Sequence, residues 1–421
     1  IPMLIHLPPS TDDIQGGGRD ERDVTNEALS QAQVMYSIIA STVTKGLKSR
    51  VFGQRHLAFE IIAAEGFIKY YAVVPAVLTE TVKQAVISAY PSARLEEIEP
   101  DSIFSKDVTT DQVAGGEMSL KKEFVYPIST YEDSQRDASL GILNAMSVTK
   151  AGEGIAVQIL LRPTDGGWTK KSEEWVQNIK SGKKVFETGK RAIGGIALLI
   201  KDFVQAFWRP PDEHEKYERD PLTNLQQEEI AAIENKTKYP GFETLIRIVA
   251  SSKTKERSEA MLGGVVAAFA QFDSQSFNGF RYDILKDARK LAVDYIFRMF
   301  PQGADSNILN SVELASLFHL PAQNAIPTSQ VERQATKQVD GPAKLVADGV
   351  LLGVNEFRGV QKEIRLSEND RRRHTYVIGS TGMGKSVLLT NVAYQDMVEG
   401  RGFAFIDPHG DAVELLLSKV P

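Results

Sequence analysis

One stretch constrains the fold of this chain more than any other: Gly379-Ser380-Thr381-Gly382-Met383-Gly384-Lys385-Ser386. It fits the phosphate-binding pattern G-x-x-x-x-G-K-[ST] at every fixed position. Residues 375–378 (Thr-Tyr-Val-Ile) predict a strand before it, and the apolar spacing of residues 387–398 predicts a helix after it. Because this pattern binds phosphate where a strand passes into a helix, the sequence favours a P-loop over a chance glycine-rich turn.

Each residue type in this loop has a chemical role. The three glycines allow the backbone N–H groups to face inward, and the start of the helix adds partial positive charge. Lys385 is placed to reach the β- and γ-phosphates, and the hydroxyl of Ser386 is placed to ligate a metal ion. The loop therefore predicts ATP and Mg²⁺ as cofactors, with Ser386 as the metal ligand.

Composition narrows the remaining possibilities. The chain has 421 residues, enough for two or three domains, and no cysteine. Disulfides, thiolate metal sites and cysteine nucleophiles are therefore excluded. A formal net charge of −6 excludes a uniformly basic surface for nucleic acid, although a local basic patch or a ring lumen could still bind DNA. No run of residues approaches the ~20 apolar residues that span a bilayer.

The first half of the chain mixes strand and helix patterns. Helix patterns occur at residues 24–50, 79–89, 134–149 and 168–184, and strand patterns at 57–63, 67–74, 93–98, 123–128 and 154–162. We expect a hairpin at residues 64–66 and a polar loop around Gly115-Gly116. This order predicts an α+β domain that is ferredoxin-like in part.

A second β-α-β unit is predicted further along. A helix at residues 225–236 is followed by a strand at 242–250, a helix at 255–272 and a strand at 280–284. The histidines of these regions, His56, His214 and His319, have no neighbours at metal-ligand spacing, and no Ser/His/Asp arrangement stands out.

Residues 185–208 combine basic residues at the start with apolar residues at helical spacing. Such a helix can lie on a membrane or a partner, or it can cover the sheet within the molecule. We favour a helix that covers the sheet within the molecule, because two central glycines weaken the helix.

Several short motifs stand in one order between residues 306 and 421. They are residues 311–321 (Ser-Val-Glu-Leu-Ala-Ser-Leu-Phe-His-Leu-Pro), Gly353-Val354-Asn355, Asp370-Arg371, His374, the loop at 379–386, and residues 406–411 (Ile-Asp-Pro-His-Gly-Asp). This stretch resembles the HerA/FtsK-type P-loop motor ATPases, most closely the coupling-protein branch of type IV secretion systems. The first three hundred residues resemble that family much less clearly.

The resemblance implies a fold, a function and partners. It implies a RecA-like α/β domain that binds ATP with Mg²⁺, assembles into hexameric rings, and moves DNA, nucleoprotein or protein substrates in a secretion or conjugation system. It also implies membrane components of that system as partners, and a cytoplasmic location at the inner face of the cell membrane.

Two further sets of residues are candidates for the site. Asp407 and Gly379 both follow predicted strands directly, so we expect both at the carboxyl edge of a parallel sheet, where Asp407 either assists the nucleotide, metal or water or caps its own turn. Arg371, Arg372 and Arg373 either reach phosphate across a subunit boundary or form a solvated strand entrance.

Hydrolysis in this class needs a second acidic strand, and no apolar strand that ends in Asp-Glu follows Ser386. The catalytic residues are therefore unknown, and we expect the chain to be the N-terminal part of a longer ATPase. The sequence divides into a lead-in and helix (1–56), an α+β domain (57–184), a helical and charged connector (185–240), a second β-α-β unit (241–305), a linker (306–348) and the start of the ATPase domain (349–421).

Two classes of function remain open. The first is an ATP-dependent motor or coupling protein. The alternative is a non-catalytic docking or assembly module of a secretion or envelope complex, with the ATPase core beyond this chain.

Overall fold

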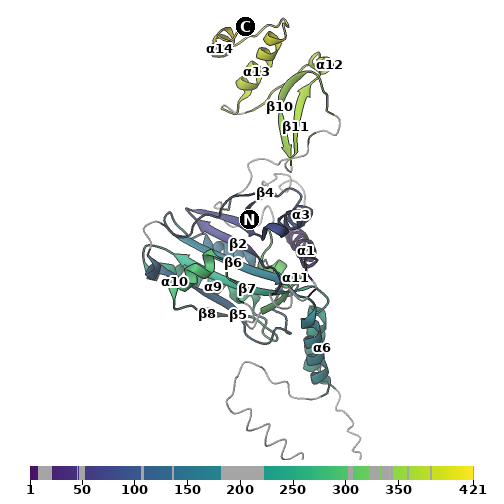
Figure 1. Ribbon diagram of the computed structural model, residues 1–421, viewed down its shortest axis with the longest axis vertical. Helices are drawn as coiled ribbons and strands as arrows, with labels where there is room; N and C mark the ends of the chain where they lie inside the picture. The colour runs from purple at the N-terminus through teal and green to yellow at the C-terminus, as the bar shows by residue number, and fades with distance from the viewer. Residues whose placement is uncertain are drawn as a thin grey trace, which may run out of the picture. The chain divides into compact units, whose positions relative to one another are not determined.

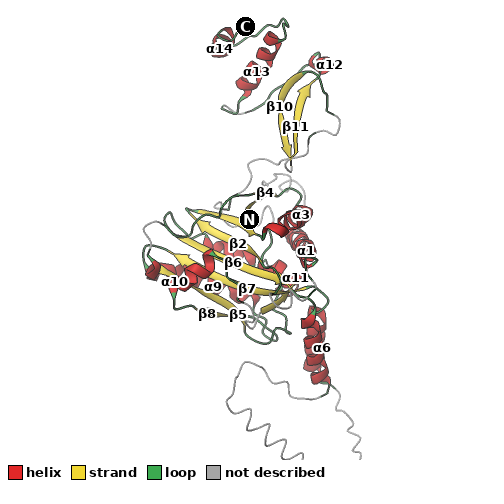
Figure 2. Ribbon diagram, viewed as in Figure 1, coloured by secondary structure: helices red, strands yellow, loops and turns green. Residues whose placement is uncertain are grey.

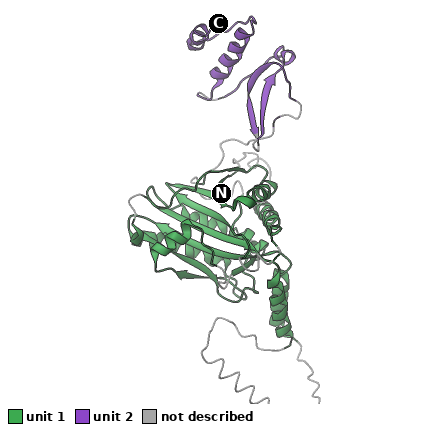
Figure 3. Ribbon diagram, in the orientation of Figure 1, with its two compact units in different colours: residues 1–336 green, residues 337–421 purple. Residues whose placement is uncertain are grey.

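The computed structural model describes residues 1–7, 21–44, 46, 53–105, 109–134, 137–181, 222–301, 307–321, 331–332, 341, 345–357, 360–379 and 382–420. The chain forms two compact units, residues 1–336 and residues 337–421 (Figure 3). The helix pattern predicted at 185–208 lies outside the described residues. No helix among the described residues is long and apolar enough to cross a bilayer.

Unit 1 is built on one nine-stranded antiparallel sheet (Figure 1). The strand order is β4-β1-β3-β2-β6-β7-β5-β8, and β9 pairs with the part of β7 that β5 leaves free. The strands are β1 (Pro2–His6), β2 (Leu57–Ala64), β3 (Phe67–Val73), β4 (Arg94–Glu96), β5 (Val113–Leu120), β6 (Gly154–Pro163), β7 (Gly241–Ser251), β8 (Phe280–Ile284) and β9 (Asn307–Asn310). The segments 57–184 and 241–305, which the sequence analysis divided, thus contribute strands to the same sheet.

The helices cover the two faces of this sheet unequally (Figure 2). One face packs against α1 (Glu21–Ala40), α3 (Thr79–Ala89), α5 (Ser139–Met146), α9 (Lys255–Ala268) and α11 (Ser311–Leu317). On the other face, the described residues supply one helix, α10 (Ala288–Ile296). Every residue of β2 and β6 is buried because both faces of these central strands are covered. The helix predicted at 79–89 is confirmed with its bounds.

The hairpin predicted at residues 64–66 is confirmed. Glu65 and Gly66 join β2 to β3 with positive φ angles of 51° and 82°. Two consecutive residues in the left-handed region are the geometry of a type I′ turn, whose twist matches that of paired strands.

The predicted polar loop around Gly115-Gly116 is wrong, because these residues lie in β5 between β7 and β8. A β-carbon on Gly115 would lie 2.4 Å from the carbonyl oxygen of Ile248, and one on Gly116 would lie 2.3 Å from that of Asp283. The glycines therefore serve close packing of neighbouring strands rather than a turn. The strand predicted at 123–128 is not formed, and these residues make turns.

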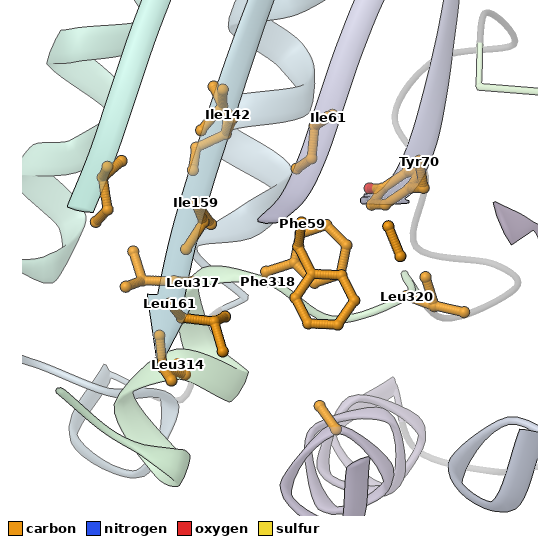
Figure 4. Packing of buried hydrophobic residues seen from close by; sticks show 14 of the residues in the cluster. Phe59, Ile61, Tyr70, Ile142, Ile159, Leu161, Leu314, Leu317, Phe318 and Leu320 are labelled. Atoms are coloured by element: carbon orange, nitrogen blue, oxygen red, sulfur yellow. The ribbon is translucent and has the colours of Figure 1, made fainter. Parts of the chain in front are cut away.

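The sequence placed residues 307–321 in a linker. Every residue of this segment is instead buried in unit 1. They form β9 and α11, and Leu314, Leu317 and Phe318 insert between the sheet and the helices (Figure 4). The ring of Phe318 stacks on that of Phe59 with centroids 4.7 Å apart. The apolar residues of this segment therefore belong to the hydrophobic core of unit 1.

A buried ion pair anchors this segment. The ammonium group of Lys236 lies 3.1 Å from Oε1 of Glu313, and neither side chain is exposed by more than 1%. Glu313 also accepts the N–H groups of Ile128 (2.9 Å) and Asn310 (2.8 Å), so its carboxylate is fully engaged. Burial lowers the pKa of Lys236, and the neighbouring Glu313 offsets this only in part.

A second buried pair joins His319 to Asp137. Nε2 of His319 lies 3.1 Å from Oδ2 of Asp137, and Nδ1 lies 2.9 Å from the carbonyl oxygen of Ala315. Because both ring nitrogens face acceptors, the doubly protonated imidazolium is the form that satisfies both contacts. Burial lowers the pKa of His319, but the charge and hydrogen bond of Asp137 outweigh it and leave the pKa raised above 6.5.

Two helices of unit 1 pack against each other in a pair. It consists of α6 (Gly167–Lys180) and α8 (Asn224–Lys236), which pack through a small apolar cluster of Val125, Val176, Ile179, Ile230 and Ile233. Tyr126 and Trp175 make an edge-to-face contact at its base, with the indole N–H donating to the Tyr126 hydroxyl at 3.0 Å.

A row of polar side chains crosses the sheet on the face that carries α10. Glu60, Gln158, Arg247 and Glu117 stand directly opposite one another on β2, β6, β7 and β5. Gln158 donates to Glu60 (2.9 Å), and Arg247 donates to Gln158 (2.9 Å) and Glu117 (2.7 Å). We call these four residues the polar row. Each buried charge in it has a partner, as burial requires.

Unit 2 begins with an antiparallel hairpin of β10 (Val350–Phe357) and β11 (Val360–Leu366). The helices α12 (Glu368–Arg371), α13 (Lys385–Val398) and α14 (Asp411–Leu417) follow. The predicted strand at 375–378 and the strand expected before Asp407 are not formed among the described residues. A strand requires a hydrogen-bonded neighbour, and here Tyr376, Ile378 and Ile406 are instead 79–93% exposed.

Candidate nucleotide-binding site

The predicted phosphate loop leads directly into α13. Gly384 is the N-cap residue of this helix, and both Gly382 and Gly384 have a φ angle of 85°. Residues with a β-carbon adopt this left-handed conformation only at an energetic cost, so glycine at these two positions is required by the turn itself. Ser380 and Thr381 lie outside the described residues.

Lys385 bridges the two ends of the loop. Its ammonium group donates a hydrogen bond of 2.6 Å to the carbonyl oxygen of Gly379. The loop residue Met383 and the hydroxyl-bearing Ser386 are both exposed to solvent. Six of the eight predicted loop residues are described, and they form one turn around the ammonium group of Lys385. They are Gly379, Gly382, Met383, Gly384, Lys385 and Ser386.

Asp407 shapes a separate turn that leads into α14. Its two carboxylate oxygens accept the N–H groups of His409 (3.1 Å) and Ala412 (2.9 Å). These backbone hydrogen bonds lower the pKa of Asp407, so the carboxylate is ionised near neutral pH. Among the described residues, its hydrogen bonds stay within this turn, which corresponds to the second of the two roles that the sequence left open for Asp407.

Polar contacts fix α13 to the rest of unit 2. The side-chain amide of Gln395 pairs with the backbone of Leu351 through hydrogen bonds of 2.8 and 2.9 Å, as a neighbouring strand would. Next to it, Asp396 pairs with Arg371, with NH1 of the arginine 2.7 Å from Oδ1. The opposite end of the phosphate-loop helix is therefore held by β10 and α12.

Of the three arginines before the loop, only Arg371 pairs with an acidic residue of α13. Arg372 and Arg373 are exposed, and Arg373 lies 3.9 Å from Asp370. Sequence reasoning missed the role of Asp396, because nothing in a helical pattern distinguishes an acidic residue that pairs with a preceding helix from a solvated one.

The loop offers the donors that a phosphate requires. The first N–H groups of a helix have no partner within it and carry partial positive charge, and here they follow directly on a lysine-bridged turn. The exposed hydroxyl of Ser386 suits a hard cation that keeps several waters. These residues therefore fit a nucleotide phosphate with Mg²⁺. No group of three metal-ligating side chains occurs among the described residues.

Unit 1 contains a Ser/His/Asp set that the sequence did not reveal. The hydroxyl of Ser139 lies 3.5 Å from Nε2 of His319, and Asp137 contacts the same nitrogen. A nucleophilic triad needs the serine and the aspartate on different ring nitrogens. The set is also buried, so its geometry is structural. Residues 180 positions apart give no pattern that sequence reading could detect.

Comparison with known proteins places most of the chain in a family. Residues 22–334 match the model of a family described as Domain of unknown function (DUF8128). The Type 4 coupling protein DotL of Legionella pneumophila is 35% identical to this chain over 66 residues. That match covers 16% of this chain and 8% of DotL, so the similarity concerns a small part of a much longer protein.

Proposed function

The chain belongs to the family described as Domain of unknown function (DUF8128), and on this premise we propose that it joins such a domain to an ATP-binding unit of a type IV coupling ATPase. The similarity to a type 4 coupling protein supports the secretion context. The contact between the Lys385 ammonium group and the Gly379 carbonyl carries the proposal, because it places a cation across a turn of helix-terminal N–H groups.

In this proposal each residue of the loop has a defined task. The N–H groups at the start of α13 bind the β- and γ-phosphates, Lys385 neutralises their charge, and Ser386 ligates the metal. Bound ATP with Mg²⁺ would supply the energy of phosphoryl transfer. Each carboxylate oxygen of Asp407 accepts one backbone N–H and keeps a second lone pair, so Asp407 can still accept a hydrogen bond from metal-bound water.

The proposal extends to assembly and substrate. The complete protein would form a homo-oligomeric ring, a hexamer by analogy with the motor ATPases that residues 306–421 resemble, and would move DNA, nucleoprotein or protein substrate. It would work at the cytoplasmic face of the inner membrane with membrane components of the secretion system.

Nucleotide binding is the first test. We expect the chain to bind a fluorescent ATP analogue in the presence of Mg²⁺, and Lys385→Ala to weaken this binding about 10- to 100-fold, because a hydrogen bond to a charged group is lost. Fluorescence anisotropy titration measures both affinities. In the complete protein, the same substitution is expected to remove most ATP hydrolysis.

Lys255→Ala is the matched control. Lys255 is an exposed lysine in the first turn of α9, and its removal should leave the affinity unchanged. Equal affinities of Lys385→Ala and the unsubstituted chain would refute nucleotide binding at this loop.

DNA binding, where it occurs, should depend steeply on salt. Because the chain carries a formal net charge of −6, only local basic surface can contact phosphate, and such contacts release counterions. We expect affinity for a DNA duplex to fall at least tenfold between low and physiological salt. A flat salt profile in the same titration would argue against phosphate contacts.

A docking or assembly module is the second candidate. The family match covers most of unit 1, whose core is complete by itself, and this favours a role that does not require the nucleotide. The two candidates separate in one experiment: a motor loses substrate transfer in Lys385→Ala, whereas a docking module that does not use the nucleotide keeps it.

A further inference from the structure

The outer side of α10 exposes a stripe of apolar side chains. Val293, Ile296 and Phe297 stand at helical positions i, i+3 and i+4, and their exposed fractions are 45%, 48% and 69%. Met299, just beyond the helix, is 50% exposed. The inner side of the same helix is buried against the sheet through Leu291 and Tyr295. These four exposed residues are called the α10 stripe.

The backbone that ends α10 turns the stripe outward. Arg298 has a φ angle of 53°, and the N–H groups of Arg298 and Met299 bond back to the carbonyls of Tyr295 and Asp294. This is a Schellman-type helix end, in which glycine normally occupies the left-handed position. A side chain with a β-carbon, such as that of arginine, makes this conformation less favourable than glycine does.

The side chain of Arg298 explains why the chain accepts this conformation. Its guanidinium group turns inward and binds the buried carboxylate of Glu60 at 2.8 and 3.1 Å. Its apolar neighbours Phe297 and Met299 consequently face solvent. The usual arrangement is reversed, with the charged residue under the helix and the apolar residues outside. Strained backbone of this kind concentrates at functional surfaces.

The polar row holds the end of α10 in place. Arg247 donates to the carbonyl oxygens of Asp294 (2.9 Å) and Met299 (3.1 Å), and Gln158 donates to that of Tyr295 (3.0 Å). The last carbonyls of the helix are thus capped by side chains of the sheet. The α10 stripe is therefore preformed, and little ordering is required when it binds.

Cations flank the stripe at the start of the helix. Lys286, Arg289 and Lys290 are exposed, and none of them forms an ion pair with any described residue. Of the acidic groups nearby, Asp287 caps the helix through the N–H of Lys290 (2.9 Å), Asp283 pairs with Arg281 (3.2 Å), and Asp294 lies on the same helix beside the three cations. An acidic protein thus presents local positive charge beside exposed apolar residues.

We propose that this face of unit 1 docks onto the surface of an anionic lipid bilayer. The apolar residues of the α10 stripe enter the boundary between headgroups and acyl chains, and Lys286, Arg289 and Lys290 contact lipid phosphates. Basic residues adjoining exposed aromatic and aliphatic ones are the combination that binds such interfaces. This surface is independent of the nucleotide loop, so it stands whether or not ATP binds.

Vesicle co-sedimentation tests the proposal with the chain as it is. We expect binding to vesicles of phosphatidylcholine with phosphatidylglycerol, and little binding to phosphatidylcholine alone. Phe297→Ser should weaken partitioning about tenfold. The triple variant Lys286→Glu/Arg289→Glu/Lys290→Glu should abolish it, since each cation near the surface contributes about fivefold. Acidic residues suit the start of a helix, so this variant is expected to fold.

Two substitutions elsewhere serve as controls. Val77→Ser removes an apolar side chain that is 65% exposed, and Lys255→Glu reverses an exposed charge in the first turn of α9. Both should bind vesicles as the unsubstituted chain does. The proposal is overturned if anionic vesicles do not bind, or if the α10 variants bind as well as the controls. It is also overturned if sedimentation equilibrium shows self-association that Phe297→Ser abolishes while vesicle binding persists.

Discussion

Replacing Lys236 with methionine is expected to lower the free energy of unfolding of unit 1 by about 3 kcal/mol. The substitution leaves the Glu313 carboxylate buried without its cation, although the N–H groups of Ile128 and Asn310 still bind it. Because Glu313 also caps α11, the loss should loosen residues 307–321 first. Urea denaturation followed by circular dichroism measures the change, and tryptophan fluorescence, to which Trp175 beside the apolar cluster of α6 and α8 contributes, gives a second readout.

Lys180→Met is the matched control on the same helical pair. Lys180 lies 3.3 Å from Glu234, but both side chains are about half exposed. Exposed pairs contribute about 0–1 kcal/mol, so the denaturation midpoint should barely move. Comparable losses in the two variants would mean that burial of the Lys236–Glu313 pair is not what stabilises this segment.

The second large effect concerns pH and the pair of His319 with Asp137. The pKa of His319 is raised above 6.5, so the pair contributes its full stability below about pH 6.5 and loses it as the pH rises through the folded-state pKa. Burial raises the pKa of Asp137, but the charge and hydrogen bonds of His319 and those of Ser139 leave it below 3.8. That contribution is present above about pH 3.8 and is lost as the pH falls through the lowered value.

We therefore expect the pair to stabilise unit 1 most between about pH 4 and pH 6.5, and Asp137→Asn to cost about 3 kcal/mol within that window. In His319→Gln, the decline in stability between pH 6.5 and pH 9 should become shallower. His6→Gln is the control, because His6 pairs with Glu96 at a partly exposed edge of the sheet. A decline of unchanged slope in His319→Gln would assign it to other groups.

The extent to which sequence predicted this structure depends on where the determining contacts lie. The helix after the phosphate loop, predicted at 387–398, is confirmed as part of α13, because its apolar spacing and the preceding glycines are local signals. The strand predicted at 375–378 depended on a partner strand, and local propensity cannot supply one. Gly115-Gly116 resembled a turn because the neighbouring carbonyls that require glycine there come from residues 248 and 283.

The buried Lys236–Glu313 pair could not be predicted from local sequence for the same reason. Lys236 and Glu313 are charged residues in helical stretches, where a sequence pattern favours solvated faces. Their burial follows from β9 pairing with β7 and from Asn310, which caps α11 and donates to the Lys236 carbonyl at 3.0 Å. In the phosphate loop, by contrast, the residues that determine the geometry are adjacent in the chain, so its turn was predictable.

The polar row also constrains the strand register that unit 1 can adopt during synthesis. The pairing of β7 is complete only when β9 has emerged, and Asn310 is 59 residues beyond Ser251, a delay of roughly 3 to 12 seconds at usual translation rates. During that interval β7 has an open edge that invites wrong partners. A slip of one residue would turn Arg247 toward the aliphatic face and separate it from Gln158 and Glu117. Strand pairings in the wrong register should therefore be short-lived, so that the nascent sheet can correct its register during synthesis.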